Sequence, residues 1–314
     1  MSVIYGIDKM PQDAPESAVA VGVFDGVHWG HRAVFSRLMQ TAAESGLTSV
    51  ALTFDKHPAE LLAPMRAPAY INTLEQRIEL IAATGVEDIV VAGFDPELAG
   101  LTRDEFLQEV LRRKLRCRHI VVGSNFRFGR NREGDIRHLE AAAPALGIQV
   151  TTVPAVIIDG APVNSTRIRA QIERGDVEAA ARLLGRRFVL RGVVVTGRKL
   201  GRSLGFPTAN LQTGPRQLLP AKGVYVVQVE LAGAVRTAVS NVGVRPTFEG
   251  GGVSVEVHVP GFEGDIYGQT LDVVFCRRLR DEMTFEAPEK LAEQIRLDLE
   301  RAAHGCESSP RQVD

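Results

Sequence analysis

The chain has 314 residues, enough for two domains, and its 45% hydrophobic and 24% charged residues are ordinary for a globular protein. The formal net charge of −1 gives no overall positive surface for nucleic acid, and no apolar run is long enough to span a membrane. The first 17 residues lack the basic and apolar segments of a secretory signal. We therefore expect a cytoplasmic protein that binds neither nucleic acid nor membrane, and we leave a homo-oligomer open.

The three cysteines are Cys117, Cys276 and Cys306. They are far apart in the sequence, odd in number, and spaced unlike any metal or redox motif. Such cysteines are typical of a reduced intracellular protein. We expect three separate thiols.

Short apolar runs alternate with helical patterns through the first half of the chain. The apolar runs predict strands over residues 18–24, 49–54, 88–94, 119–126 and 149–158. The patterns between them predict helices over residues 32–46, 73–85, 102–115 and 139–147, the second and third of which open with capping boxes. This alternation predicts a parallel sheet covered on both faces, in a doubly wound, Rossmann-like α/β domain.

The periodicity changes after a last helical stretch over residues 165–187. Short β-branched runs between Gly/Pro turns predict strands over residues 188–197, 223–231, 235–243, 253–259 and 270–279, and a helix follows over 287–302. Five or six strands and one helix favour a small antiparallel β-barrel with a C-terminal helix. We place the domain boundary near Gly185, which gives a first domain over 1–185, a barrel domain over 186–304 and an expected disordered tail over 305–314.

The sequence G-V-F-D-G-V-H-W-G-H, residues 22–31, lies where the first strand ends and the first helix begins. This is the carboxyl edge of an open α/β sheet, where ligands bind, and the free N–H groups of a helix start favour phosphate. Gly22, Gly26 and Gly30 would let a polyphosphate approach the backbone closely. The segment therefore predicts a phosphate-binding site.

His28 and His31 in this segment can donate hydrogen bonds to phosphate oxygens and stabilise charge that develops on a transferring phosphorus centre. Two alternatives remain. With Asp25 nearby, the H-x-x-H spacing could bind zinc, although no further His or Cys cluster completes such a site. The histidines could also be structural. Because the chain has neither a P-loop nor a G-x-G-x-x-G motif, nucleotide binding would not depend on those motifs.

A second group of candidate residues lies over 197–211, G-R-K-L-G-R-S-L-G-F-P-T-A-N-L. Glycines and cations before a strand suggest a loop that faces phosphates. Alternation along the strand places Thr208 and Asn210 on one face, and oxygen ligands beside ATP phosphates suit Mg²⁺. By itself, P-T-A-N is also an ordinary turn sequence.

The run V-S-V-E-V-H-V, residues 253–259, alternates strictly, so Ser254, Glu256 and His258 share the face opposite to the valines. The simplest interpretation is a solvated face of the barrel. The alternative is that Glu256 emerges beside a site for ATP and takes a proton from a substrate hydroxyl.

The H-x-G-H segment resembles the ATP-binding motif of the nucleotidyltransferase superfamily. N-S-T-R-I-R, residues 164–169, is similar to the superfamily's second signature, with Asn164 where Ser is usual, although Ser165 and Thr166 could simply cap a helix. V-V-G-S-N-F-R-F-G-R-N-R-E-G-D, residues 121–135, resembles a segment of the bacterial flavin-forming branch, although Arg127, Arg130 and Arg132 could form a solvated basic loop.

The second half resembles the bacterial riboflavin kinase module in six ordered segments, among them G-F-P-T-A-N, S-N-V-G-V-R-P-T-F and V-E-V-H-V. The whole is therefore similar to the bifunctional riboflavin kinase/FMN adenylyltransferase family over about residues 15–303. Trp29 and Val257 stand where that family usually has Leu and Thr.

The resemblance implies ATP-dependent formation of FMN from riboflavin in the barrel and of FAD from FMN in the first domain. It implies catalytic roles for Glu256, His28 and His31, and Mg²⁺ ligation by Thr208 and Asn210. It further implies ATP or flavin contacts from Gly22, Phe24, Asp25, Gly30, Asn125, Ser165, Thr166, Arg167, Gly197, Lys199, Gly201, Gly205, Phe206 and Pro207. Rival hypotheses are a nucleotidyltransferase acting on another phosphorylated molecule, and a flavin-binding module without catalysis.

Overall fold

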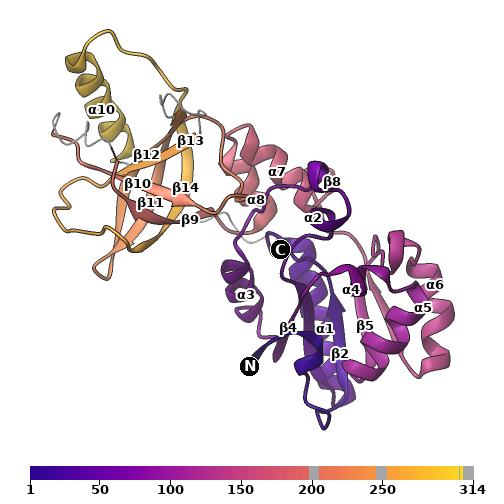
Figure 1. The fold of residues 1–314 in the computed structure, drawn as a ribbon. Coiled ribbons are helices and arrows are strands. Elements are labelled where there is room, and N and C mark those ends of the chain that lie inside the picture. The colour runs from indigo at the N-terminus through magenta and orange to yellow at the C-terminus, as the bar shows by residue number, and fades with distance from the viewer. Residues whose placement is uncertain (198–204, 245–252, 304, 307–314) are drawn as a thin grey trace. The chain divides into compact units, whose positions relative to one another are not determined.

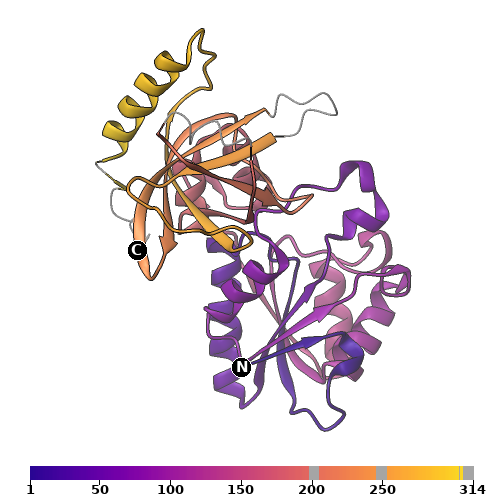
Figure 2. The ribbon, with the colours of Figure 1, turned by 60° about the vertical axis from the view of Figure 1, so that its left-hand side comes forward.

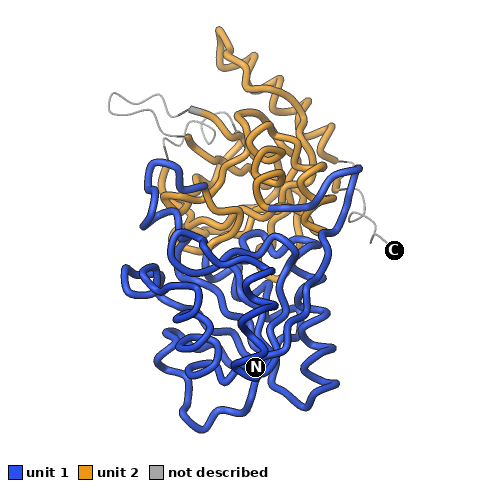
Figure 3. Tube along the Cα trace, turned by 90° about the vertical axis from the view of Figure 1, so that its right-hand side faces the viewer, with its two compact units in different colours: residues 1–68, 74–164 blue, residues 69–73, 165–314 orange. Residues whose placement is uncertain are grey.

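The computed structural model describes residues 1–197, 205–244, 253–303 and 305–306. The chain divides into two compact units, shown in different colours in Figure 3. Unit 1 comprises residues 1–68 and 74–164, and unit 2 comprises residues 69–73 and 165–314. Within the described ranges, no helix is both long enough and apolar enough to cross a membrane.

Unit 1 is built on one six-stranded sheet in which every pair of neighbouring strands is parallel. The strand order is β1-β4-β3-β2-β5-β6. The strands are β1 Ser2–Tyr5, β2 Ser17–Val21, β3 Thr48–Phe54, β4 Asp88–Ala92, β5 Cys117–Gly123 and β6 Gln149–Val153. From β2 the chain runs outward to β3 and β4, then returns to β5 on the other side. The carboxyl ends of the paired strands β2 and β5 therefore mark the switch point at which doubly wound folds bind ligands.

Helices cover both faces of this sheet, as the sequence predicted (Figure 1). Buried side chains of α1 (Trp29–Ser45) and α3 (Leu74–Ala82) pack on one face, and those of η3 (Phe106–Lys114) and α6 (Ile136–Ala142) pack on the other. The shorter elements are η1 Ile7–Lys9, α2 Pro58–Leu62, η2 Pro64–Arg66, α4 Pro96–Gly100, α5 Arg103–Glu105, η4 Arg130–Arg132, η5 Ala143–Leu146 and the hairpin β7 Ile157–Ile158 and β8 Ala161–Pro162.

Two features of unit 1 differ from the sequence-based expectation. The short edge strand β1 was not predicted, because its four residues are only partly buried and show no clear period. The helix predicted over 102–115 is one α-helical turn, α5, continued by the π-helix η3. The wider π turn still buries Phe106, Leu107, Val110 and Leu111, so the apolar pattern alone did not distinguish the two helix types.

Unit 2 contains a closed antiparallel barrel in the order β10-β13-β12-β11-β14-β9, with helix α10 beside it (Figure 2). Its elements are β9 Phe188–Val195, β10 Thr208–Thr213, β11 Gly223–Leu231, β12 Ala234–Val244, β13 Val253–His258, β14 Thr270–Arg280 and α10 Pro288–Ala302. The prediction of an antiparallel barrel followed by a helix is confirmed. The strand β10 is the one expected after the glycine-rich loop, where alternation placed Thr208 and Asn210 on one face.

The helices α7 (Ser165–Glu173) and α8 (Val177–Leu184) belong to unit 2, together with residues 69–73. Helix α8 packs against β9 and β14, and the Ala221 amide donates a hydrogen bond to the Ile172 carbonyl. Tyr70 and Leu218 are joined through their backbones in the same unit. A boundary near Gly185, which remains a prediction, would separate both helices from the barrel.

This packing predicts a difference between two fragments. Both 165–314 and 186–314 should fold, but the shorter one exposes the strand surface that α8 covers, including the surface against Leu183 and Leu184. We expect 186–314 to melt several degrees below 165–314 when circular dichroism is followed with temperature. Equal melting temperatures would show that α7 and α8 contribute nothing to the stability of the barrel.

The expectation of three separate thiols is wrong for two of the cysteines. Cys276 on β14 and Cys306 after α10 are joined in a disulfide, with their Cα atoms 5.4 Å apart. Cys276 lies with Val226 and Ala302 in the apolar cluster between the barrel and α10. Only the folded barrel places these cysteines together, since they are 30 positions apart in the sequence. Cys117 is buried in the sheet, and this burial raises the pKa of its thiol to about 12.

The disulfide should stabilise unit 2 by roughly 3.5 kcal/mol, the loop-closure value for a loop of this length. Reduction should therefore lower the melting temperature of the wild type to that of Cys306→Ser, while the variant itself should not respond to reductant. Intact mass spectrometry of the untreated protein should show a loss of two hydrogens. A mass corresponding to three free thiols would contradict the pairing.

Candidate active sites

The loop after β2 leads directly into α1 at the switch point of the unit 1 sheet. Helix α1 begins at Trp29, earlier than the sequence predicted, so His28 is its N-cap residue and His31 lies in the first turn. The His28 carbonyl accepts the Arg32 amide at 2.9 Å. A helix of 17 residues directs its first N–H groups and its partial positive charge at this edge of the sheet.

The two histidines lie face to face. The His28 and His31 rings stack with centroids 3.7 Å apart and planes 20° apart. The ring of Phe24 meets His31 edge-on at 5.3 Å and packs on Phe35 at 4.6 Å. His28 is 4% exposed, so its ring is buried where it stacks on His31.

The loop has two strained backbone positions, and two of its glycines lie where a side chain would meet an aromatic ring. Phe24 and Val27 have φ of 53° and 37°, a region that non-glycine residues rarely adopt. A side chain at Gly22 would approach the Phe24 ring to 2.9 Å, and one at Gly30 would come within 3.1 Å of the His28 ring. These glycines therefore leave room for the rings of Phe24 and His28.

Asn125 lies in the turn after β5, on the strand that neighbours β2 at the switch point. The Phe126 amide donates to the Gly123 carbonyl at 3.0 Å, which closes this turn. The structure thus brings the Asn125 turn and the His28 loop to adjacent strand ends. Ser165, Thr166 and Arg167 begin helix α7 of unit 2.

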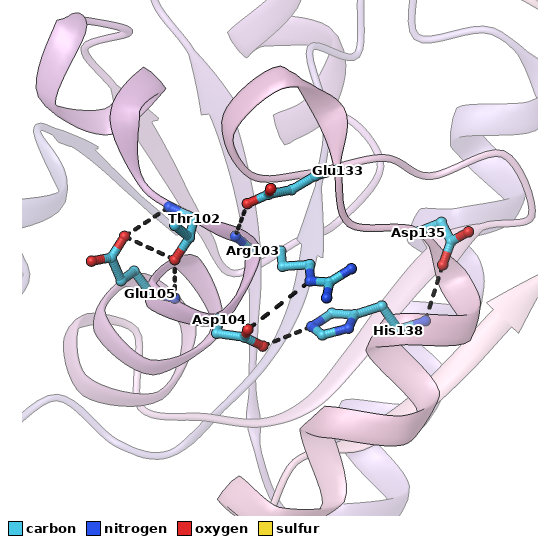
Figure 4. Close-up of polar contacts among 7 residues, drawn as sticks. All are labelled: Thr102, Arg103, Asp104, Glu105, Glu133, Asp135 and His138. Atoms are coloured by element: carbon cyan, nitrogen blue, oxygen red, sulfur yellow. Dashed lines mark hydrogen bonds and ion pairs between the residues drawn. The ribbon is translucent and has the colours of Figure 1, made fainter.

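The segment after Asn125 folds back on itself as a hairpin, and Arg127, Arg130 and Arg132 are exposed on it, as a solvated basic loop would have them. Phe128 and Gly134 exchange backbone hydrogen bonds of 3.1 and 2.9 Å, and Phe128 is buried. Figure 4 shows the polar contacts that hold the end of this hairpin and the neighbouring helices α5 and α6.

In that network, His138 of α6 lies 2.7 Å from Asp104 of α5, and the Arg103 amide donates to Glu133 at 3.0 Å (Figure 4). Thr102 and Glu105 form the predicted capping box, and the hydrogen bonds from Thr102 lower the pKa of Glu105. Glu133 therefore ties the hairpin to α5, and His138 ties α5 to α6.

In unit 2, β10 and β13 bring the predicted kinase residues together. Asn210 lies opposite Glu256, and Thr208 lies opposite His258. The Thr208 hydroxyl donates to a Glu256 carboxylate oxygen at 3.3 Å. Because directly opposed residues share a face, the side chains of Thr208, Asn210 and Glu256 form one polar patch, while Val255 and Val257 are buried on the other face.

The residues before β10 are only partly described. A side chain at Gly197 would collide with the Asn210 amide, which explains the glycine. Gly205 has a φ of 83°, a value suited to glycine, and Phe206 and Pro207 follow it. Lys199 and Gly201 lie outside the described residues.

The donor set of this patch fits Mg²⁺ better than zinc. Within the described ranges, no group of three His, Cys, Asp or Glu side chains could hold a metal ion. A hydroxyl, an amide and a carboxylate are oxygen donors, and Mg²⁺ needs few protein ligands when ATP phosphates and water supply the rest.

Two family models match the chain in order. The model for FAD synthetase matches residues 10–167, and the model for riboflavin kinase matches residues 184–305. A bifunctional riboflavin kinase/FMN adenylyltransferase of Pseudomonas fluorescens is 37% identical over 303 residues, which cover 96% of this chain and 97% of the relative. The chain belongs to the bifunctional riboflavin kinase/FMN adenylyltransferase family.

Membership of this family gives the chain both enzymatic activities, in the order that the sequence predicted. The protein of the same name from Escherichia coli K12 is 36% identical and covers 95% of this chain and 96% of its own. A solved structure described as a macrolide-efflux protein from Streptococcus pneumoniae matches with a TM-score of 0.88 and 32% identity, over 98% of this chain and all of that one. That description differs from the family names, and we carry over only its fold.

Arg77 of α3 is one residue that the sequence analysis missed in the FAD synthetase part. Its guanidinium, 1% exposed, donates 2.7 Å hydrogen bonds to the carbonyls of Val23 and Phe54. The Thr53 hydroxyl also donates to Val23, at 3.1 Å. The loop that carries His28 is therefore tethered to α3 and β3. The sequence contained one sign of this role, because Arg77 is a cation on the apolar face of a helix, next to Ile78.

Asn241 in the riboflavin kinase part was also missed. It lies opposite Glu256 on β12, so Asn210, Glu256 and Asn241 form a row across three strands. The motif S-N-V-G contains Asn241, but only the strand register brings it to Glu256.

Arg169 is the last residue of the second nucleotidyltransferase signature, and it lies in helix α7. Its Nε donates to the Ala69 carbonyl at 2.7 Å, within unit 2.

Proposed function

We propose that each of the two reactions is carried out by its own set of residues, one set in unit 1 and one in the barrel of unit 2. The loop at the switch point of unit 1, with His28 and His31, transfers AMP from ATP to FMN. The polar patch of Thr208, Asn210 and Glu256 on the barrel phosphorylates riboflavin. The observation that carries this proposal is the convergence of that patch across β10 and β13, because it places a carboxylate beside two neutral oxygen donors.

In FAD formation, a phosphate oxygen of FMN attacks the α-phosphorus of ATP, and the bond to pyrophosphate breaks. The nucleophile is already an anion, so this step needs no general base. His28, His31, Asn125 and the start of α1 would stabilise the charge that develops. The surrounding contacts to ATP and flavin would come from Gly22, Phe24, Asp25 and Gly30.

In FMN formation, the terminal ribityl hydroxyl of riboflavin attacks the γ-phosphorus of ATP, and ADP leaves. Glu256 accepts the hydroxyl proton as this bond forms. Thr208 and Asn210 would hold Mg²⁺, which would neutralise phosphate charge when bound. The segment before β10 would contact ATP or flavin through Gly197, Lys199, Gly201, Gly205, Phe206 and Pro207.

The purified full-length protein, incubated with riboflavin, ATP and Mg²⁺, should make FMN first and FAD later when the flavins are separated by chromatography. FAD from supplied FMN without FMN from riboflavin would remove the kinase assignment. Flavin binding with no product would leave only a binding module, and transfer of AMP to another phosphorylated compound would support a different nucleotidyltransferase.

We also propose a cytoplasmic enzyme that works on these small molecules without nucleic acid or membrane. Cytoplasmic thiols are normally kept reduced, so the state of Cys276 and Cys306 in cells bears directly on this location. Alkylating free thiols at the moment of cell lysis would show whether Cys276 and Cys306 are reduced or joined in cells. Sedimentation of the purified protein would decide between a monomer and a homo-oligomer.

A further inference from the structure

His258 is the last residue of β13 and lies directly opposite Thr208 of β10. It is two residues from Glu256, so the two side chains share a face of the strand. The imidazole is 9% exposed. A buried polar ring in this position needs a hydrogen-bond partner, and the partner shows what the ring does.

That partner is the backbone just before β10. His258 Nδ1 lies 2.8 Å from the Pro207 carbonyl oxygen, and because a carbonyl only accepts, Nδ1 carries the proton. The ring also meets Phe206 edge-on, with centroids 5.6 Å apart and planes 81° apart. Pro207 has no backbone N–H with which to form a ladder hydrogen bond. The hydrogen bond from the imidazole to its carbonyl therefore holds this segment in place.

The contact completes a closed chain of contacts around the kinase patch. His258 binds the carbonyl of Pro207, which directly precedes Thr208. The Thr208 hydroxyl lies 3.3 Å from Glu256, which is two residues before His258 on the same strand. A shift of Pro207 would move the Thr208 hydroxyl away from the carboxylate. The hydrogen bond therefore acts on both the general base and one of the two candidate Mg²⁺ donors.

We propose that His258 is a positioning residue of the riboflavin kinase site, which holds Thr208 in place for Mg²⁺–ATP through the Pro207 carbonyl. This inference rests on the proposed kinase function of Thr208 and Glu256. The alternative is that His258 only fills space in the barrel wall, in which case its N–H is irrelevant to the Mg²⁺ dependence.

Three substitutions separate the hydrogen bond from packing. His258→Leu keeps an apolar side chain of moderate size but has no donor. His258→Asn places an amide N–H near the position of Nδ1, whereas His258→Gln places its amide near Nε2. Val239→Ala is the matched packing control, since Val239 lies opposite His258 on β12 and belongs to the apolar cluster beneath α10.

The experiment titrates Mg²⁺ at fixed ATP and riboflavin with full-length protein, and measures FMN. Loss of a residue that orients a metal ligand typically costs about 10- to 100-fold, so His258→Leu and His258→Gln should raise the Mg²⁺ concentration for half-maximal rate by about 10-fold or more. His258→Asn should restore most of the response. Val239→Ala should lower the melting temperature without changing the Mg²⁺ response.

Each outcome decides between the alternatives. A wild-type Mg²⁺ response in His258→Leu would overturn the inference. Equal defects in the Mg²⁺ response of the Asn and Gln variants, matched by equal losses in melting temperature, would overturn the inference in favour of packing. This comparison remains possible even if the Leu variant does not fold. A wild type that makes no FMN would instead remove the proposed kinase function. FAD formation from supplied FMN, in the same preparations, should stay unchanged.

Discussion

Glu256→Gln should lower the rate of FMN formation from riboflavin by about 10²–10⁴-fold, the usual cost of losing a general base. Gln keeps the length of the side chain and can still accept the hydrogen bond from Thr208, but it cannot take the proton from the ribityl hydroxyl. FAD formation from supplied FMN should continue at the wild-type rate, because Glu256 lies in the barrel and the adenylyl transfer is assigned to unit 1.

The measurement uses one preparation and two starting flavins. Asn241→Ala is an informative companion, since Asn241 lies opposite Glu256 on β12 but offers no base. It should affect substrate affinity more than the maximal rate. If Glu256→Gln slows both reactions equally, the residue is structural. If neither reaction slows, Glu256 is not the general base and the base lies elsewhere.

His28→Ala combined with His31→Ala should abolish FAD formation and leave FMN formation nearly intact. Each preorganised donor on a developing charge typically contributes on the order of 10²–10³ in rate, and the two rings stack 3.7 Å apart at the start of α1. Because the rings support each other, the single substitutions should not be additive. Either one alone should already cost much of the double effect.

Transfer of AMP to FMN and the melting temperature should be followed together. A folded double variant that still makes FAD would show that the histidines are not catalytic. Zinc in the wild type, lost with the fold in the variant, would support the metal-site alternative instead. Trp29 is the single tryptophan of the chain and lies between the two histidines, so its fluorescence reports on this loop. Added ATP should change it in the wild type.

The sequence determined the features that depend on short-range patterns. Apolar runs and helical periods were sufficient to predict strands β2 to β6 and the change to a barrel, because the period of the side chains follows from the local backbone. The order of the motifs was sufficient for the family. The alternation of residues 253–259 was sufficient to place Glu256 and His258 on one face, opposite the valines.

Only the tertiary structure decided which of these local pieces meet. The partners of Glu256, namely Asn210 and Asn241, depend on the register of three strands, and a one-residue slip would turn them to the other face. The disulfide of Cys276, the tether from Arg77 to the His28 loop and the bond from His258 to Pro207 each join residues far apart in the sequence. Such contacts depend on the packing of whole elements, so no local pattern along the chain specifies them.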